Sequence, residues 1–565
     1  MGEAAQLPGQ VQPLRRGRFG SGVHGFAFPC RGSGIPSGQS RRHARAAASP
    51  GRKAMDGQVV SGDRSISQAA LMGNAARAAG GFDRLGVGAN DTVAMMLRND
   101  FAFFEGAFGA ALIGAYATPI NWHYKADEAG YIVEDSDAKV LLVHADLLPQ
   151  IAGGIPAHVH VFVVKTPPEI RDAYGLDDAA CAVPAGRTDW DQWVAQQPAW
   201  DRPAPALRTN IIYTSGTTGR PKGVRREPAT PEMAAKIEEM VSVIFDVRPG
   251  EERRTVVTGP VYHSAPNLYA LMNVRDGGLT ILQPRFDPED LLAMIERHRI
   301  THLHMVPTMF VRLLKLPAEV RARYDLSSLR FVVHAAAPCA PEVKRQMIEW
   351  WGPVINEYYG GTETGGAVFH TAEEALRKPG TVGRPIPGAV VRIYDDEGQI
   401  LPPGKVGEIF LRIGDWPDFT YHKKDEMRRE CERDGLITCG DVGWLDEDGF
   451  LFISDRKKDM VISGGVNIYP AEIESVLIAM PGVADCGVFG IPDEEFGEAL
   501  CAFVQPQPGA ALDAAQVRAW LRQRIAGYKV PKQVEFRSEL PREDSGKIFK
   551  RKLREPYWAQ AGRAI

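Results

Sequence analysis

The stretch Ile211-Ile-Tyr-Thr-Ser-Gly-Thr-Thr-Gly-Arg-Pro-Lys-Gly-Val224 indicates both the fold and the chemistry. Its apolar start, residues 211–213, predicts the end of a buried strand, and residues 214–223 are all Gly, Ser, Thr, Arg, Pro or Lys. Such a loop can direct backbone N–H groups, hydroxyls and one ammonium at a polyphosphate. A flexible linker can have the same composition. A Walker A string, G-x-x-x-x-G-K followed by Ser or Thr, does not occur in the chain, which excludes a P-loop kinase.

The residues of this loop have distinct expected roles. Gly216 and Gly219 permit positive φ and a close approach of the backbone to a ligand. Lys222 neutralises negative charge. The hydroxyl donors are Thr214, Ser215, Thr217 and Thr218.

The composition is that of an ordinary globular enzyme. Of the 565 residues, 44% are apolar and 24% are charged, and a formal net charge of −4 gives no support to a nucleic-acid partner. The seven cysteines form no C-x-x-C pair, which argues against a disulfide framework or a zinc site, so we expect a reducing, cytoplasmic location. The longest apolar stretch, residues 106–117, is too short to span a bilayer and predicts a buried helix.

The first 54 residues differ from the rest. They contain nine Lys and Arg residues against a single acid, Glu3, with many Gly, Pro and Ser residues. This segment is either an organelle transit segment or a spurious extension that precedes a true start at Met55. We favour the second interpretation, because no amphipathic helical stripe is present, and we expect the segment to be disordered.

Alternating strand and helix patterns predict an α/β fold. Strands are expected at 91–97, 139–144, 159–165, 255–259, 279–283, 301–306 and 330–334, and helices at 66–79, 101–114, 231–244 and 287–298. Residues 166–207 look like a surface connection. Short strands after residue 388 predict a β-subdomain, and a compact α+β unit follows residue 455. We therefore predict a leader at 1–54, a large N-terminal domain of helix-covered sheets at 55–457, and a small, mobile α+β domain at 458–565.

The phosphate-loop stretch resembles that of the adenylate-forming superfamily, which includes acyl-CoA synthetases, luciferases and the adenylation domains of peptide synthetases. Every position of that signature is filled here. The resemblance covers about residues 60–555, with five motifs in the order of the family. It implies that ATP and a carboxylic acid form an acyl adenylate, from which coenzyme A takes the acyl group.

A second motif, Asn356-Glu-Tyr-Tyr-Gly-Gly-Thr-Glu-Thr364, resembles the Y-G-x-T-E segment of the family. The resemblance implies that Tyr359 stacks near adenine, that Thr362 contacts the phosphates and that Glu363, together with Thr214, holds Mg²⁺. A lone carboxylate with hydroxyls around it suits this ion. The nucleotide-binding set implied here also includes Glu357, Tyr358 and Gly360.

Two further segments complete the implied nucleotide site. The small residues Ala336, Ala337 and Pro338 offer a flat backbone surface to adenine. The segment Thr438-Cys-Gly-Asp441 resembles the T-G-D motif, which implies that Asp441 accepts hydrogen bonds from both ribose hydroxyls. Cys439 departs from the usual Thr and leaves Gly-Asp intact.

The C-terminal motifs imply a moving domain. By resemblance, Arg456 touches ribose or phosphate and Lys458 is the hinge. Ser463, Gly464 and Gly465 would line a tunnel for the pantetheine arm of coenzyme A. In Leu540-Pro-Arg-Glu-Asp-Ser-Gly-Lys547, Lys547 would bridge the acid and the α-phosphate and leave on rotation.

On the acid side, His263 resembles the residue that gates the acyl pocket. Enzymes that adenylate amino acids have Asp at the next position, where this chain has Ser264, which argues against amino acids. An apolar acid is expected, because apolar and aromatic residues surround this position: Tyr262, Tyr269, Leu271 and Met272.

Taken together, the motifs predict an ATP-dependent acyl-CoA synthetase that uses a small-molecule acid, ATP, Mg²⁺ and coenzyme A. The alternatives are a ligase that loads a carrier protein, an aryl-acid CoA ligase, and a catalytically silent protein on the same fold. The last predicts losses at Glu363, Asp441 or Lys547, and all three are present. The oligomeric state stays open, a homodimer included.

Overall fold

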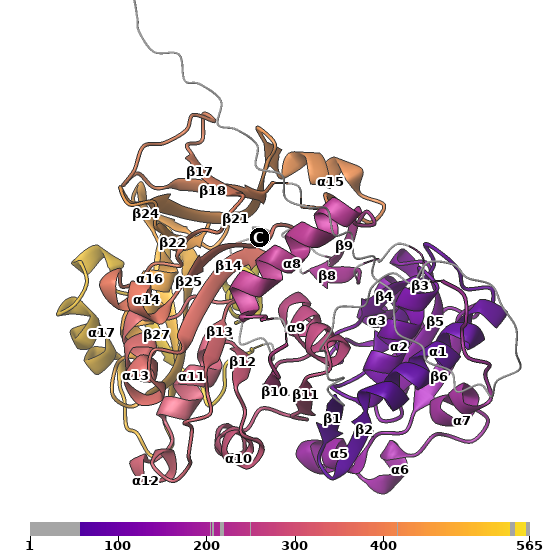
Figure 1. Ribbon diagram of the computed structural model, residues 1–565. Coiled ribbons are helices and arrows are strands. Elements are labelled where there is room, and N and C mark those ends of the chain that lie inside the picture. The colour runs from indigo at the N-terminus through magenta and orange to yellow at the C-terminus, as the bar shows by residue number, and fades with distance from the viewer. Residues whose placement is uncertain are drawn as a thin grey trace, which may run out of the picture. The chain divides into compact units, whose positions relative to one another are not determined.

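The computed structural model describes residues 57–203, 205, 208, 210–214, 220–248, 250–414, 416–542 and 548–560. The predicted leader at 1–54, loop residues 215–219 and Lys547 lie outside this part of the chain. Within it the fold is α/β, as predicted, with five sheets (Figure 1). In the same ranges, no helix combines the length and the apolar character that crossing a membrane requires.

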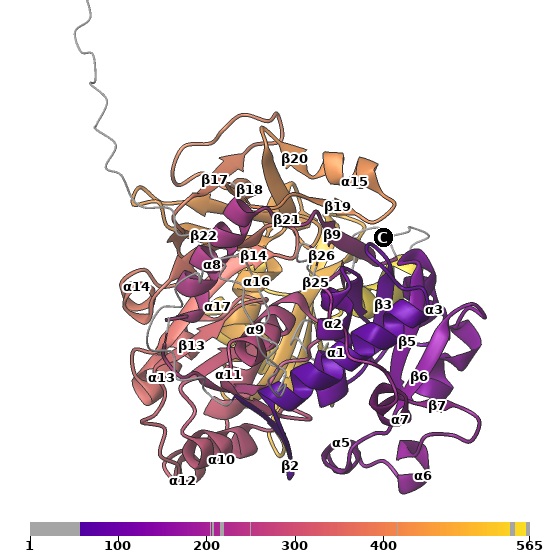
Figure 2. The same cartoon turned by 45° about the vertical axis from the view of Figure 1, so that its right-hand side comes forward.

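The first sheet is wholly parallel, and its order is β4-β3-β5-β6-β7. Its central strands β3 and β5 are buried, except at Lys139, because helices cover them. Helices α1 and α2 lie side by side (Figure 2). The predicted strands and helices are confirmed at β3 (Thr92–Met96), β5 (Ala138–His144), β6 (His160–Val164), α1 (Gln68–Arg84) and α2 (Phe101–Leu112). The other elements of this region are β4 (Tyr116–Pro119), β7 (Thr188–Asp189), α3 (Ala126–Asp135) and α4 (Leu148–Ile151).

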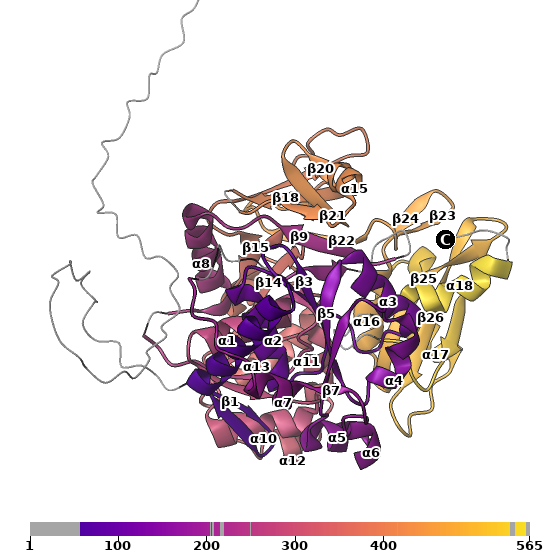
Figure 3. The ribbon, with the colours of Figure 1, turned by 90° about the vertical axis from the view of Figure 1, so that its right-hand side faces the viewer.

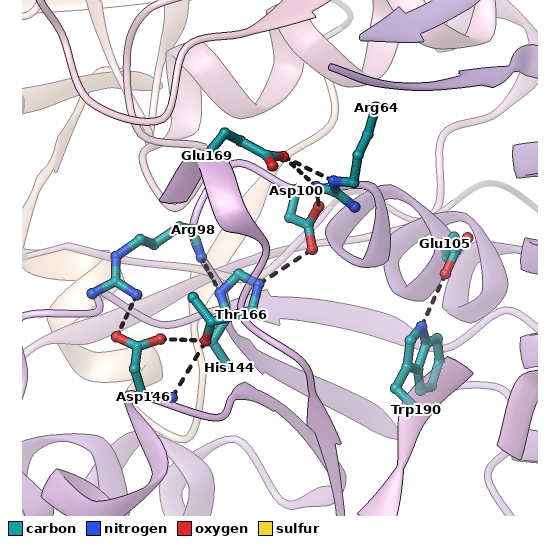
Figure 4. A network of polar contacts seen from close by, with 9 residues as sticks. All are labelled: Arg64, Arg98, Asp100, Glu105, His144, Asp146, Thr166, Glu169 and Trp190. Atoms are coloured by element: carbon teal, nitrogen blue, oxygen red, sulfur yellow. Dashed lines mark hydrogen bonds and ion pairs between the residues drawn. The ribbon is translucent and has the colours of Figure 1, made fainter. Parts of the chain in front are cut away.

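The prediction that residues 166–207 are a surface connection was wrong in part. The segment forms α5 (Pro168–Tyr174), α6 (Asp178–Cys181) and α7 (Trp190–Ala195). Trp190 is fully buried, and its indole N–H donates to Glu105 Oε2 at 2.9 Å (Figure 4). The many Pro and Asp residues of this segment suggested a surface loop. The buried position of Trp190 could not be recognised because its hydrogen-bond partner lies on α2, 85 residues earlier.

The second sheet has nine strands, in the order β16-β15-β14-β13-β12-β10-β11-β1-β2. Strands β1 and β10 to β14 are parallel, so their carboxyl ends meet at one edge of the sheet, where ligands bind in open α/β folds. The strands are β1 (Gln58–Ser61), β2 (Arg64–Ser67), β10 (Arg254–Val257), β11 (Leu279–Leu282), β12 (His302–Met305), β13 (Phe331–His334), β14 (Ile355–Gly361), β15 (Gly365–His370) and β16 (Arg384–Pro385).

Helices cover this second sheet and bury a large apolar core against it. Helix α10 begins after Asp287, whose side chain accepts from the N–H of Asp290, as its acidic first turn predicts. The covering helices are α8 (Pro231–Phe245), α9 (Ser264–Arg275), α10 (Pro288–His298), α11 (Pro307–Leu314), α13 (Pro341–Trp351) and α14 (Ala372–Arg377). A short helix without buried residues, α12 (Ala318–Arg321), follows α11.

Two smaller sheets complete the N-terminal region. A three-stranded sheet consists of β8 (Ile212–Thr214), β9 (Lys222–Arg226) and β19 (Phe419–Tyr421), so strands almost 200 residues apart are paired. The expected β-subdomain contains β17 (Ala389–Tyr394), β18 (Gly407–Ile413), β20 (Glu432–Arg433), β21 (Leu436–Leu445) and β22 (Leu451–Arg456), with α15 (Asp425–Glu430).

The C-terminal α+β unit follows β22. Its helices pack on a sheet ordered β24-β23-β26-β25, with β27 on β26 (Figure 3). The domain boundary proposed near residue 458 falls in the turn before β23. The elements are β23 (Val461–Ser463), β24 (Val466–Ile468), α16 (Pro470–Ile478), β25 (Val483–Asp493), β26 (Gly497–Pro506), α17 (Ala514–Arg522), β27 (Gln533–Phe536) and α18 (Lys550–Gln560).

Candidate functional site

The two ends of the expected phosphate loop face each other. Thr214, the last residue of β8, pairs with Lys222, the first residue of β9. The Lys222 ammonium lies 4.8 Å from the ring centroid of Tyr421, whose strand β19 flanks β9 on the other side. Residues 215–221, of which 215–219 lie outside the described part of the chain, therefore connect the paired ends of two antiparallel strands.

Beside this hairpin lies the turn that follows β14. The phenol of Tyr421 donates to Glu363 Oε1 at 3.0 Å. Burial and the Glu363 carboxylate raise the pKa of Tyr421 far above its usual value, so the phenol remains a donor. Thr362 Oγ1 donates to Ser264 Oγ at 3.2 Å, which joins the turn to the first residue of α9.

Arg226, at the end of β9, holds the backbone of the same turn. Its guanidinium donates to the carbonyl oxygens of Thr362, Glu363 and Pro417, each at 2.7 Å. The carboxylates of Glu363 and Asp418 favour this charge through space. Burial lowers the pKa of Arg226 to about 10. Three carbonyl groups thus replace water around a buried charge.

The expected ribose site is assembled from two sheets. Asp441 on β21 pairs in register with Arg456 on β22, and Arg456 Nε lies 3.6 Å from Asp441 Oδ1. Tyr359 on β14 donates from its phenol to Asp441 Oδ2 at 2.7 Å. A Cβ on Gly361 would lie 2.7 Å from Cys439 Sγ, so the Y-G-x-T-E and T-G-D segments are closely packed.

The expected adenine segment follows β13. Ala336 is exposed and has a φ of +74°, a conformation that an L-residue adopts at a cost. Ala337 and Pro338 continue the turn before α13 begins at Pro341. Strained backbone with small side chains at the carboxyl end of a parallel strand suits a flat ligand surface.

Glu357 lies deeper than its neighbours in the motif. Its carboxylate accepts from the Lys344 ammonium, and Oε2 lies 3.0 Å from Nε2 of His370. Burial alone would raise the pKa of Glu357, but the Lys344 charge overrides it and lowers this pKa far below the usual range. The side chain is engaged in the interior, so only the backbone of Glu357 is left to contact a nucleotide.

Behind the turn, aromatic side chains fill the space between α8, α9 and the second sheet. The Tyr358 phenol lies 3.2 Å from His304 Nε2, and the Tyr269 phenol lies 2.9 Å from Thr255 Oγ1. The Phe245 ring packs against the rings of Tyr269, His304 and Tyr358. Burial lowers the pKa of His304 to about 4, so the imidazole is neutral.

The loop that carries His263 precedes α9 directly. His263 occupies the position before the first helical residue, and the Tyr262 ring packs edge-on against Trp122 with centroids 4.6 Å apart. This loop, residues 259–263, follows the carboxyl end of β10.

The glycine pair expected to line a tunnel forms a tight turn between β23 and β24. Gly464 and Gly465 have φ values of +57° and +77°, the pattern of a two-residue hairpin turn. Ser463 pairs with Gly497. Turn geometry alone requires these glycines, whatever passes beside them.

The structure thus brings Lys222, Thr362, Glu363 and Ser264 together, and joins Tyr359 to Asp441 and Arg456. Sequence reasoning missed Arg226 and Tyr421. The paired arginines Arg225 and Arg226, inside a strand that follows a phosphate loop, were the available signal for the first.

The donor set suits Mg²⁺. Tyr421 donates to Glu363 Oε1 and lies against Lys222, and a carboxylate that accepts one such bond keeps lone pairs on both oxygens for an ion. In the described ranges, no group of three or more His, Cys, Asp or Glu residues could hold a metal. An ion bound through one or two carboxylates and substrate phosphates needs no such cage.

Comparison with known proteins identifies the family. Residues 43–415 match the AMP-binding enzyme family, and residues 472–547 match the AMP-binding enzyme C-terminal domain. A feruloyl-CoA synthase of Amycolatopsis sp is 34% identical over 509 residues, which cover 88% of this chain and 95% of that protein. A long-chain-fatty-acid–CoA ligase of Mycobacterium tuberculosis is 33% identical over 480 residues, 84% of this chain and 90% of that protein.

Solved structures agree. The ATP-bound MatB of Rhodopseudomonas palustris superimposes with a TM-score of 0.74 at 28% identity, over 90% of this chain and 96% of that one. The match extends over both the N-terminal region and the C-terminal unit. The chain therefore belongs to the AMP-binding enzyme family and is an ATP-dependent, AMP-forming acid–CoA ligase of the acyl-CoA synthetase type.

Proposed function

We propose that this ligase activates an apolar carboxylic acid with a compact, aromatic body. Acid and ATP give acyl-AMP and pyrophosphate, and coenzyme A then gives the thioester and AMP. The supporting observation is the buried cluster of Phe245, Tyr269, His304 and Tyr358. Two of its members lie on the elements that carry the Thr362–Ser264 contact: Tyr269 on α9, which begins at Ser264, and Tyr358 on β14, which precedes Thr362. Rings in this place favour an aryl acid over a long alkyl chain.

For the nucleotide, we assign the triphosphate to residues 214–219 and Lys222, and adenine to residues 336–338 and Tyr359. Asp441 and Arg456 would hold the ribose. Asp441 already accepts from Tyr359, and a carboxylate has enough lone pairs to accept the ribose hydroxyls as well.

Mg²⁺ would be held by Glu363 and Thr214 together with phosphate oxygens, and when bound it neutralises charge on the triphosphate. The chain's own contribution is to fix the Glu363 carboxylate. Tyr421 donates to the side chain and Arg226 to the backbone.

The C-terminal unit would supply a mobile cation. Lys547 would approach the acid carboxylate and α-phosphate during adenylation, where a positioned ammonium screens the repulsion between two anions. A rotation at Lys458 would then withdraw it and bring residues 463–465 to the pantetheine arm. The mobility of this domain and the boundary at residue 458 belong to this proposal.

His263 and Ser264 would contact the acid. A side-chain hydroxyl at position 264 offers no countercharge to an α-ammonium group, which supports an acid without one.

The test is a pyrophosphate-release screen of purified enzyme with ferulic, indoleacetic, benzoic and lauric acids, with and without coenzyme A. We expect aromatic acids to be turned over fastest, with AMP release that depends on coenzyme A. A preference for lauric acid would refute the aromatic assignment. Acyl-AMP that accumulates despite coenzyme A would instead favour a ligase that loads a carrier protein.

We further propose a cytoplasmic location, which the scattered cysteines support, and a homodimer as the state to test first by light scattering.

A further inference from the structure

A buried asparagine that follows a strand of the first sheet is hydrogen-bonded to the loop of the second sheet that carries His263. Asn99 follows β3, and its side chain is almost completely buried. Its Nδ2 donates to the carbonyl oxygen of Gly259 at 3.0 Å, and its Oδ1 accepts from the N–H of Val261, also at 3.0 Å. One amide therefore satisfies two backbone groups of a loop 160 residues away.

The residues on both sides of Asn99 are fixed by a buried polar network (Figure 4). The backbone N–H of Arg98 donates to His144 Nδ1 at 3.1 Å, and its guanidinium pairs with Asp146 at 2.7 Å. On the other side, Asp100 accepts from Arg64 at 2.6 Å. Because His144 Nδ1 accepts a hydrogen bond, Nε2 carries the proton that faces Asp100 Oδ2 at 3.3 Å.

Asp100 also shows that this network is not ordinary helix capping. It precedes α2 at the N-cap position, where an aspartate usually accepts from the first turn of the helix. Its side chain makes no such bond and is directed at Arg64 and His144 instead. The network therefore stabilises the position of segment 98–100 and not the helix that follows.

A second buried asparagine holds the same loop from the opposite side. Asn267 on α9 donates from Nδ2 to the carbonyl oxygen of Val261 at 2.7 Å, and its Oδ1 accepts from Asn210 at 2.8 Å. Both backbone polar groups of Val261 are thus bonded to asparagine side chains. The next residues are Tyr262, His263 and Ser264, and Ser264 contacts Thr362.

We propose that Asn99 is a positioning residue for acid binding, which fixes loop 259–263 and through it the place of His263 and Ser264. This inference rests on the proposed role of those two residues at the acid. Asn99 itself does not touch the substrate. Its amide links the loop to the first sheet, so a change at Asn99 displaces acid contacts and leaves the Thr214–Lys222 hairpin and Asp441 untouched.

The decisive variant is Asn99→Asp. This variant keeps the shape of the side chain and the hydrogen bond from the Val261 N–H. It loses the donor to the Gly259 carbonyl and places a carboxylate oxygen against that buried carbonyl oxygen, which is unfavourable. With the acid of highest turnover among ferulic, indoleacetic and lauric acids, we expect the KM for the acid to rise about tenfold to a hundredfold. The KM for ATP should change less than about twofold, since the nucleotide contacts are unaltered.

Asn273→Ala is the matched control. Asn273 is equally buried, lies near the other end of α9, and donates to Leu279 O at 3.1 Å and Thr280 Oγ1 at 2.8 Å. It should lower the midpoint of thermal unfolding without raising the KM for the acid. The positioning role would be overturned if Asn99→Asp raised the KM for the acid and the KM for ATP equally. It would also be overturned if Asn273→Ala raised the KM for the acid selectively.

Asn267→Asp provides a second approach in case Asn99→Asp does not fold. It disturbs the same loop from α9 and should give the same selective rise in the KM for the acid. An unchanged KM for the acid in this variant would contradict the inference. A wild-type enzyme that releases no AMP with any acid would refute the proposed function itself, a result separable from any difference between variants.

Discussion

Tyr421 donates a hydrogen bond of 3.0 Å to the carboxylate of Glu363, which comes from a different sheet. The tyrosine lies on β19, which pairs with β9, and the Lys222 ammonium lies over its ring. One phenol therefore joins the carboxylate proposed for Mg²⁺ to the lysine proposed for phosphate. Since the pKa of Tyr421 is far above neutral, this donor is present at every pH at which the enzyme would be assayed.

Tyr421→Phe should slow adenylation about tenfold, because a hydrogen bond to a charged group that must be held in place is lost. Transfer of the acyl group from supplied acyl-AMP to coenzyme A should be unchanged. Pyrophosphate exchange and thioester formation measure the two steps separately. Tyr394→Phe, which removes a similar bond of 2.8 Å to Asp434, is the control. Equal losses in both half-reactions would count against the assignment of Glu363 to adenylation.

Arg226→Lys should both destabilise the protein and slow adenylation. A lysine cannot reach the carbonyls of Thr362, Glu363 and Pro417 together, so buried acceptors lose their donors at a cost of about 2–4 kcal/mol in unfolding free energy. Urea denaturation measures this loss.

The matched control for this change is Arg253→Lys, at a buried arginine that pairs with Asp276 at 2.6 Å. Both variants should lose stability, but only Arg226→Lys should slow pyrophosphate exchange in protein that is still folded. If pyrophosphate exchange falls in proportion to the loss of stability in both variants, Arg226 has no role in adenylation beyond stabilising the fold.

The sequence predicted most strands and helices because hydrophobic periodicity depends on local residues. Strand β3, for example, is buried throughout, and its apolar run Val93–Met96 can be recognised without knowledge of its neighbours in the sheet. Motif positions Tyr359, Asp441 and Arg456 also proved to be in contact, although their side-chain roles stay predictions.

The positions that sequence reasoning missed act through the backbone of distant segments. Arg226 and Asn99 bond carbonyl groups that lie 136 and 160 residues away, and carbonyl groups carry no sequence signal. Glu357 illustrates the opposite case. Its motif context implied a nucleotide contact, but Lys344 and His370, which engage its carboxylate, come from elements that no pattern links to it.

Lys547→Ala should lower adenylation about 10²- to 10³-fold, by analogy with the loss of a preorganised charge at a developing anion. Thioester formation from supplied acyl-AMP should persist, because the lysine would have left the site by then. Lys552→Ala, at an exposed position of α18, is the control. If both half-reactions fell together, the mobile role of Lys547 would be wrong.

Gly465→Leu should impair thioester formation about a hundredfold and spare pyrophosphate exchange, because a side chain would obstruct the proposed path of the thiol. The strain of a positive φ has to be separated from this effect. Gly435 offers the matched control, since its φ of +74° and its place in the turn before β21 are similar, and a Cβ there meets open space as at Gly465. If Gly435→Leu lost thioester formation to the same extent, the effect of Gly465→Leu would result from backbone strain and not from an obstructed thiol path.

Asp100→Asn should remove part of the stability that depends on pH. Burial alone would raise the pKa of Asp100, but the hydrogen bond from His144 and the charge of Arg64 lower it to about 2, below the value of about 3.9 in an unfolded chain. The carboxylate therefore contributes about 2–3 kcal/mol above about pH 4, and this contribution is lost as the pH falls toward 2. Urea unfolding should show wild type well above Asp100→Asn at about pH 7, with the gap closing in acid. Asp63→Asn, at an exposed position, should have the same unfolding free energy as wild type at each pH. If the difference in unfolding free energy between wild type and Asp100→Asn stayed constant with pH, the Asp100 carboxylate would not be the titrating group.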